Sequence, residues 1–228
     1  QGAKAKEEDF VEHLFVANTH DYILFFTDKG KCHWLKVHEI PPGGRAARGR
    51  AIVNLLGTEP GEKVKAFVSV KTFDEEKFIV MATRKGIIKK TKLSAYGKPR
   101  KGGIYAIDIR EGDELIEAKI TNGENDIVLG TREGKSIRFP ETDARPMGRK
   151  TRGVIGIKLS KKNDYVVGMV VVRREGTLLV ATEKGFGKRT EVIQYRIQKR
   201  SGKGVLAMRT NKKVGKMVAI MEVVDTDD

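Results

Sequence analysis

The chain has 228 residues, 39% of them hydrophobic, which is enough for one large or two small folded domains, and its formal net charge is +15. The longest apolar run, Met169–Val172, is far too short to cross a bilayer, and the polar start Gln1–Asp9 predicts no signal peptide. A single cysteine, Cys32, excludes an internal disulfide and fits a reducing compartment, so we expect a cytoplasmic protein.

Two short sequence marks recur about fifty residues apart, which is the sign of a repeat architecture. The first mark is a Thr-x-x-Gly turn, found at Thr27–Gly30, Thr83–Gly86, Thr131–Gly134 and Thr182–Gly185. The second is a basic residue before glycine, found at Arg48–Gly49, Lys101–Gly102, Arg152–Gly153 and Lys203–Gly204. Together they predict a single repeat domain over 1–228, with units at 10–62, 63–113, 114–163 and 164–215, and with 216–228 starting a further one.

Each unit is predicted to hold four strands. The first is a β-branched run such as 165–172 or 217–224, the second ends at the turn threonine, and the third leaves the turn glycine, as in 135–139. The fourth follows the basic-glycine mark, where Ile155, Ile157 and Leu159 alternate as in a strand. Four strands at this period are typical of a propeller blade, so we predict an all-β, propeller-like disc with about four to five blades.

The positive charge is concentrated in four segments between the predicted third and fourth strands, 41–53, 96–103, 145–153 and 196–204, which we call the basic linkers. They hold no acidic residue and fourteen of the 45 basic ones, while the rest of the chain carries 31 basic residues against 30 acidic ones. The basic side chains are Arg45, Arg48, Arg50, Lys98, Arg100, Lys101, Arg145, Arg149, Lys150, Arg152, Arg196, Lys199, Arg200 and Lys203.

In a radial fold, the same linker of every blade lies on the same rim, so the four basic linkers predict a continuous positive belt. The linkers lack the interleaved aromatic residues on which single strands stack, and they lack a helix that could enter a major groove. We therefore expect them to contact the phosphates of double-stranded DNA, largely independently of sequence.

Other functions predict different sequence features. A propeller that docks protein partners would present apolar and aromatic anchors in its loops, and a binder of anionic membranes would place its lysines on one flat surface. Gly44–Gly49 has the spacing of a phosphate-binding loop, but Arg50-Ala51 follows in place of Lys-Ser/Thr. Cys32, His33 and His38 lack the ligand set of a zinc site, and we expect no cofactor, no metal and no membrane partner.

The repeat resembles the C-terminal domain of the A subunit of DNA gyrase and its topoisomerase IV counterpart, over essentially the whole chain. The family carries a signature, Gln-Arg-Arg-Gly-Gly-basic-Gly, in the linker of its first blade. Here the fourth linker reads Gln198-Lys-Arg-Ser-Gly-Lys-Gly204, departing at Lys199 and Ser201. Because the match lies in another repeat, the choice between gyrase and topoisomerase IV activity stays open.

The resemblance implies a β-pinwheel, a propeller-like disc whose blades exchange strands. It implies a non-catalytic module that wraps duplex DNA around its rim for strand passage by an ATP-dependent type IIA topoisomerase, with Gln198 among the DNA-binding residues. The implied partners are the N-terminal breakage-reunion domain of the same chain and the ATPase (B) subunit, in association with the nucleoid.

Overall fold

The computed structural model describes residues 16–44, 47, 49–173 and 176–223. The strands are β1 (Tyr22–Thr27), β2 (Lys31–Lys36), β3 (Val64–Val70), β4 (Phe78–Thr83), β5 (Ile87–Lys92), β6 (Ile104–Tyr105), β7 (Leu115–Thr121), β8 (Asp126–Thr131), β9 (Lys135–Pro140), β10 (Val154–Ile155), β11 (Val166–Val172), β12 (Thr177–Thr182), β13 (Gly187–Glu191), β14 (Val205–Leu206) and β15 (Met217–Val223). One short helix, α1 (Ile52–Leu56), and four single-turn 3₁₀ helices, η1 (Val37–Glu39), η2 (Leu93–Tyr96), η3 (Glu141–Asp143) and η4 (Val192–Gln194), accompany them.

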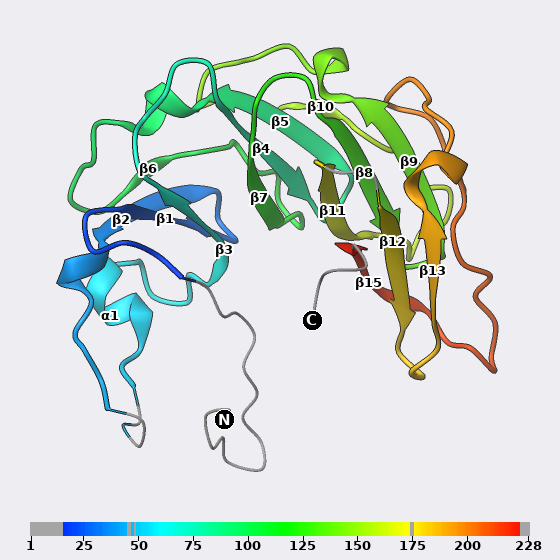
Figure 1. The fold of residues 1–228 in the computed structure, drawn as a ribbon, viewed down its shortest axis with the longest axis horizontal. Coiled ribbons are helices and arrows are strands. Elements are labelled where there is room, and N and C mark those ends of the chain that lie inside the picture. Colours follow the sequence, from blue (N-terminus) through cyan, green and yellow to red (C-terminus); the bar gives the residue numbers. More distant parts are fainter. Residues whose placement is uncertain (1–15, 45–46, 48, 174–175, 224–228) are drawn as a thin grey trace.

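The strands form four antiparallel sheets, which we call blades one to four, and these follow one another around an open arc (Figure 1). Their strand orders are β3-β1-β2-β6, β7-β4-β5-β10, β11-β8-β9-β14 and β15-β12-β13. The strands β3, β7, β11 and β15 contact one another in turn along the inner side of the arc. The predicted all-β propeller-like class is confirmed.

The blades exchange strands, so they cut across the sequence repeats. In blade one, β1 and β2 come from the predicted unit 10–62, whereas β3 and β6 belong to the unit 63–113. The outermost strand of each of the first three blades has two residues, and it reaches its blade only after the chain has built most of the next one. Each of the first three blades therefore receives its outermost strand from the chain segment that follows the next blade's hairpin.

The core lies between the blades. One buried cluster joins Phe26 of blade one to Met81 of blade two, a second joins Val80 of blade two to Leu129 of blade three, and a third joins blades three and four. Because both faces of each inner blade are covered, its middle strand is apolar on both sides, as in β4, whose residues 79–83 are all buried.

The recurring Thr-x-x-Gly turn has a structural reason. The hydroxyl oxygen of Thr83 accepts the backbone N–H of Ile87 at 3.2 Å, and the hydroxyl group donates to the carboxylate of Asp113 at 2.7 Å. Thr27 makes the same pair of contacts with Lys31 and Glu62. The buried hydroxyl thus fastens its hairpin to the loop that precedes the blade's inner strand.

The turn glycine receives the exchanged strand. The carbonyl oxygen of Gly86 accepts the N–H groups of Gly156 and Ile157, at 2.8 and 3.3 Å, and Gly30 and Gly134 accept the equivalent pairs. Gly86 has a φ of 85°, and a Cβ there would lie 2.7 Å from the carbonyl oxygen of Ile157, so only glycine fits without displacing the strand.

The structure corrects three expectations about the fourth strand. In the third repeat this strand ends at Ile155, so Ile157 and Leu159 lie beyond it, and Ile155 is exposed whereas Ile157 is buried.

In the second repeat, the glycine that directly precedes the exchanged strand is Gly103 rather than Gly102. A Cβ at Gly103 would lie within 3 Å of Cys32 and His33, whereas a Cβ at Gly102 would meet no atom within 4 Å. In the first repeat, the segment after Gly49 forms α1. A strand of two residues forms only by pairing with the edge of the preceding blade. The described residues contain no blade before blade one, so the segment after Gly49 has no such edge to pair with.

Candidate nucleic-acid interface

Three of the basic linkers run along the outer edge of the arc, each from a 3₁₀ helix to an exchanged strand (Figure 1). The second linker runs from η2 to β6, the third from η3 to β10, and the fourth from η4 to β14. Because equivalent elements begin and end each one, the three linkers occupy the same place on successive blades.

A side chain from the preceding blade fastens the start of each linker. The indole Nε1 of Trp34 donates to the carbonyl oxygen of Tyr96 at 2.9 Å. At the equivalent position Lys90 forms an ion pair of 2.9 Å with Glu141, the first residue of η3. In the next blade Arg138 donates to the carbonyl oxygen of Val192 at 2.9 Å. Three different residues thus perform one task, each from the outer strand of its hairpin.

The backbone of the same strand holds the linker at its middle. The N–H of Met147 donates to the carbonyl oxygen of Lys90 at 2.9 Å, and the N–H of Gln198 donates to that of Arg138 at 2.8 Å. The linker then ends in the pairing of β10 with β5, or of β14 with β9. A loop that is fixed at its start, middle and end loses little further entropy when it binds a ligand.

Most of the predicted basic residues point into solvent without a partner. Among the described residues, eight linker side chains are exposed and have no hydrogen-bond or ion-pair partner. They are Lys98, Arg100, Lys101, Arg145, Lys150, Arg196, Lys199 and Lys203. Unpaired cations at equivalent places on three blades leave an uncompensated positive field along this edge.

Three arginines are tied to the protein. Arg149 donates to the carbonyl oxygen of Tyr105 at 3.3 Å, and Arg200 donates to that of Ile155 at 3.1 Å. Arg152 forms an ion pair of 2.7 Å with Asp108, in which both side chains are about half exposed. The guanidinium groups of Arg149 and Arg200 contact neutral carbonyl groups, so these contacts leave their positive charge available to a ligand. The charge of Arg152 is partly offset by the carboxylate of Asp108.

The first linker differs from the other three. Arg50 is exposed and stands just before α1, so it does not lead into an exchanged strand. Arg45 and Arg48 lie outside the described residues. The structure therefore brings eleven of the predicted basic residues onto three equivalent linkers and leaves Arg50 apart from them, just before α1.

The signature-like segment 198–204 is built into the junction of blades three and four. The amide Nε2 of Gln198 is buried and has no hydrogen-bond partner among the described residues. Ser201 has a φ of 67°, in the left-handed region that glycine prefers, and its N–H donates to the carbonyl oxygen of Gly156 at 2.7 Å. The family's glycine at this position is thus explained by backbone geometry.

Sequence reasoning missed Lys89, which lies beneath the third linker. Its side chain is fully buried, and its ammonium donates to the carbonyl oxygen of Ala106 at 2.5 Å and to that of Arg149. Burial, followed by the nearby charge of Arg149, lowers the pKa of Lys89 to about 7. Lys89 thus joins the segment that follows β6, at the end of the second linker, to the middle of the third linker.

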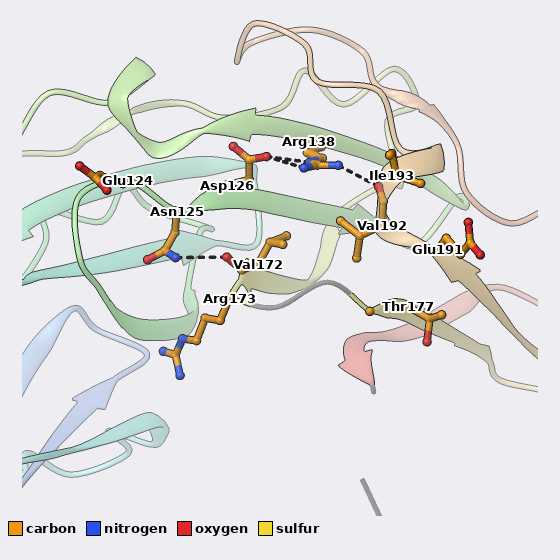
Figure 2. A pocket seen from close by; sticks show the side chains of 11 residues that line it. Glu124, Asn125, Asp126, Arg138, Val172, Arg173, Thr177, Glu191, Val192 and Ile193 are labelled. Carbon is orange, nitrogen blue, oxygen red and sulfur yellow. Dashed lines mark hydrogen bonds and ion pairs between the residues drawn. The ribbon is translucent and has the colours of Figure 1, made fainter. Parts of the chain in front are cut away.

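A cavity of about 790 Å³ lies between blades three and four (Figure 2). Arg138 lines it, but its guanidinium is engaged by Asp126 at 2.7 Å and by Val192. Asn125 donates to the carbonyl oxygen of Val172 at 3.1 Å. The contact of Arg138 with Val192 joins blade three to blade four, whereas its ion pair with Asp126 and the contact of Asn125 with Val172 lie within blade three.

No helix within the described residues is long and apolar enough to cross a membrane. The chain is similar to the DNA gyrase A subunit of Haemophilus influenzae, with 42% identity over 98% of this chain and 28% of the relative. It is also similar to the DNA gyrase A subunit of Clostridium acetobutylicum, with 49% identity over all of this chain and 27% of the relative. The chain thus spans little more than a quarter of the length of these relatives.

Solved structures show the same fold. The C-terminal domain of a DNA topoisomerase IV superposes with a TM-score of 0.85 at 26% identity, covering 98% of this chain and 70% of that one. The C-terminal domain of a DNA gyrase A has a TM-score of 0.79 at 24% identity, covering 92% and 68%. The family described as "DNA gyrase C-terminal domain, beta-propeller" matches residues 21–71, 77–122, 125–173 and 176–223. With four repeats matched and the exchanged strands in place, the chain belongs to the DNA gyrase C-terminal domain family.

Proposed function

We propose that this domain binds duplex DNA by its backbone and wraps it around the outer edge of the arc. One observation carries the proposal: equivalent linkers on three successive blades hold eight exposed and unpaired basic side chains. Duplex DNA is a uniform polyanion, so a regular curved row of cations fits its phosphates without reading bases. Bending is favoured because a bent duplex reaches the linkers of more blades than a straight one.

The domain would then serve a type IIA topoisomerase as a non-catalytic module of its A subunit. The similar proteins are DNA gyrase A subunits, of which this chain spans little more than a quarter. DNA cleavage would lie in the breakage-reunion domain of the same polypeptide, and ATP hydrolysis in the B subunit. The wrap would present a DNA segment for strand passage in the cytoplasm, on the chromosome.

The test is a binding series over duplex length and salt concentration. We expect affinity to rise with length from about 20 to about 80 base pairs, because longer duplexes reach more blades. The logarithm of the binding constant should fall with the logarithm of salt concentration by about 0.9 per phosphate neutralised. A flat salt dependence, or equal affinity at all lengths, would contradict the proposal.

A matched pair of variants locates the contact. Replacing Lys98, Arg100 and Lys101 with alanine removes three unpaired linker charges, and we expect the salt slope to fall by about 2 to 3. The control removes the same charge outside the linkers by replacing the exposed residues Lys63, Lys71 and Lys162. Equal losses in both variants would indicate a general charge effect rather than a binding edge.

A further inference from the structure

Three loops cross the end of the blades at which the Thr-x-x-Gly turns lie, which we call the turn end. Each of these turn loops runs from the outer edge of one blade to the inner strand of the next, and we name it after the second blade: 106–114 for blade two, 156–165 for blade three and 207–216 for blade four. Each ends beside the hairpin turn of its blade, as where Glu183 donates its N–H to the carbonyl oxygen of Lys216 at 2.9 Å. The turn loops therefore continue the linkers from the rim onto the turn end.

The charge of a linker taken together with its turn loop rises along the arc. The segment 96–114 holds four basic and four acidic residues, 145–165 holds seven basic and one acidic, and 196–216 holds eight basic and none. The linkers do not produce this rise, because each of the three carries three or four basic residues and no acid. The turn loops produce it, so the positive surface is confined to the rim at blade two and extends onto the turn end at blade four.

The turn loop of blade four also lacks the carboxylate that fastens its equivalents. In blade two, Asp113 stands two residues before the inner strand and accepts the hydroxyl of Thr83 at 2.7 Å. In blade four Gly215 holds that place, and Thr182 donates to the backbone carbonyl oxygen of Val214, again at 2.7 Å. The loop is thus fastened in the same way without a negative charge.

Three cations of this loop are left uncompensated. Arg209, Lys212 and Lys213 are exposed, and their side chains have no hydrogen-bond or ion-pair partner in the described part of the chain. The backbone beneath them is held, because Asn211 accepts the N–H of Lys213 at 2.9 Å through its side chain and that of Gly215 at 2.8 Å through its carbonyl oxygen. Cations on a fixed backbone suit a repeating anionic ligand.

The three cations follow a line from blade three to blade four. Arg209 comes directly after Met208, whose N–H donates to the turn glycine of blade three, Gly134, at 3.0 Å. The carbonyl oxygen of Lys212 accepts the ammonium of Lys184, which lies in the hairpin turn of blade four. The line therefore leads away from the fourth linker, across the turn end (Figure 1).

We propose that the turn loop of blade four binds phosphates of the duplex where it leaves the rim, so that the DNA path is inclined toward the turn end. This inference rests on the proposed function, and it adds the direction in which the wrap is displaced. Bending brings the entering and leaving parts of a duplex toward each other, and their like charges favour a sideways displacement of one part. A positive surface that widens at one end of the arc, and toward one side, gives that displacement its direction.

The first test maps the DNA path with an iron chelate attached to a single cysteine. Cys32 is fully buried, so the parent thiol is protected from the reagent. The chelate is placed in the turn loop of blade four by Lys213→Cys, in the fourth linker by Lys199→Cys, and in the turn loop of blade two by Glu111→Cys. On a duplex of about 80 base pairs we expect strong total cleavage from the first two positions and only background from the third.

The outcomes separate the two proposals. If position 213 cuts no more than position 111 while position 199 cuts, the inference is wrong, although the proposed function stands. Strong cleavage from position 111 as well would mean that the duplex is not displaced toward blade four, which also overturns the inference. If the parent domain fails to bind duplex DNA at all, it is the proposed function that fails.

The second test removes the charge of the loop by replacing Arg209, Lys212 and Lys213 with alanine. On a duplex of about 80 base pairs the salt slope should fall by about 2 to 3, whereas affinity for about 20 base pairs, which the linkers alone can hold, should stay within about twofold. The linking-number shift per bound domain should fall as well. A variant that keeps the parent slope and linking-number shift would contradict the inference, even if it loses a protein partner.

The matched control removes three exposed basic side chains from the turn end of blades one and two, as Lys29→Ala, Lys63→Ala and Arg110→Ala. We expect the parent slope and linking-number shift there, because the inclined path does not cross this part of the turn end. Equal losses in the two variants would indicate a general charge effect and overturn the inference.

Discussion

The ammonium nitrogen of Lys90 lies 2.9 Å from Oε2 of Glu141, and both side chains are buried where blade two meets blade three. The same carboxylate accepts the hydroxyl of Thr121 and the backbone N–H groups of Gly123 and Asn125. A buried charge is tolerated only when it is paired and hydrogen-bonded, and Glu141 meets both conditions. Because Glu141 is the first residue of η3, from which the third basic linker runs, this ion pair fixes the start of that linker.

Replacing Glu141 with glutamine should destabilise the domain by about 3 kcal/mol. The substitution leaves the Lys90 ammonium buried without its counter-charge and turns an amide group toward backbone donors. Urea unfolding followed by circular dichroism measures the change. Replacing both partners, as Lys90→Met with Glu141→Leu, should cost less than Glu141→Gln alone, and a larger loss in the double variant would contradict this reading.

Replacing Ser201 with glycine should stabilise the domain by about 0.5 to 1 kcal/mol. The φ of 67° is unfavourable for serine, and glycine removes that strain while adding entropy to the unfolded chain. The matched control is Ser94→Gly in η2, where φ is not positive and a loss of stability is expected. Equal losses in the two variants would show that Ser201 is not strained.

The stability contributed by Lys89 should depend on pH. Its pKa is lowered by burial to about 7, whereas the unfolded chain retains the ordinary value of 10.5. Between these values the unfolded chain binds the proton that the folded chain releases, so stability rises with pH there, by at most about 1.4 kcal/mol per pH unit. Below pH 7 the penalty for the buried charge is fully present.

The variant Lys89→Met lacks this proton and serves as the reference. The difference in unfolding free energy, parent minus variant, should increase from about pH 7 to about pH 10 in urea titrations. A difference that stays constant, or that falls over this range, would mean that Lys89 keeps its proton in the folded protein.

Replacing Asp108 with asparagine should tighten duplex binding severalfold at low salt. The carboxylate pairs with Arg152 at 2.7 Å on an exposed surface, and its removal frees that charge for a phosphate. The gain should disappear at high salt because exposed charges are screened. Gel shifts at two salt concentrations measure it, with Arg152→Ala as the opposite control, and weaker binding by Asp108→Asn would contradict the account.

Much of the fold could be predicted because its marks have local causes. The threonine hydroxyl and turn glycine of each hairpin act within a few residues of each other, so the spacing of Thr83 and Gly86 reveals the hairpin directly. The acid-free linkers could be found as well, since a charge imbalance is visible in composition alone. Eight of those basic side chains are exposed and unpaired in the described structure.

The exchange of strands could not be derived from residue patterns. A two-residue strand such as β6 has no periodicity, and its partner β2 lies about seventy residues earlier in the chain. The adjacent Lys89 and Lys90 show a second limit. Strand alternation places them on opposite faces, which suggests that one is solvated, yet both are buried because neighbouring blades cover both faces of the sheet.

The most direct test of the wrapping proposal is the linking number of DNA closed in the presence of the domain. Nicked circles saturated with protein would be sealed by ligase, stripped of protein and resolved as topoisomers on a gel. We predict a shift of one sign that grows with the protein-to-DNA ratio and shrinks when Lys98, Arg100 and Lys101 are replaced by alanine. Circles that bind the domain, as judged by gel shift, but close with the topoisomer distribution of free DNA would contradict it.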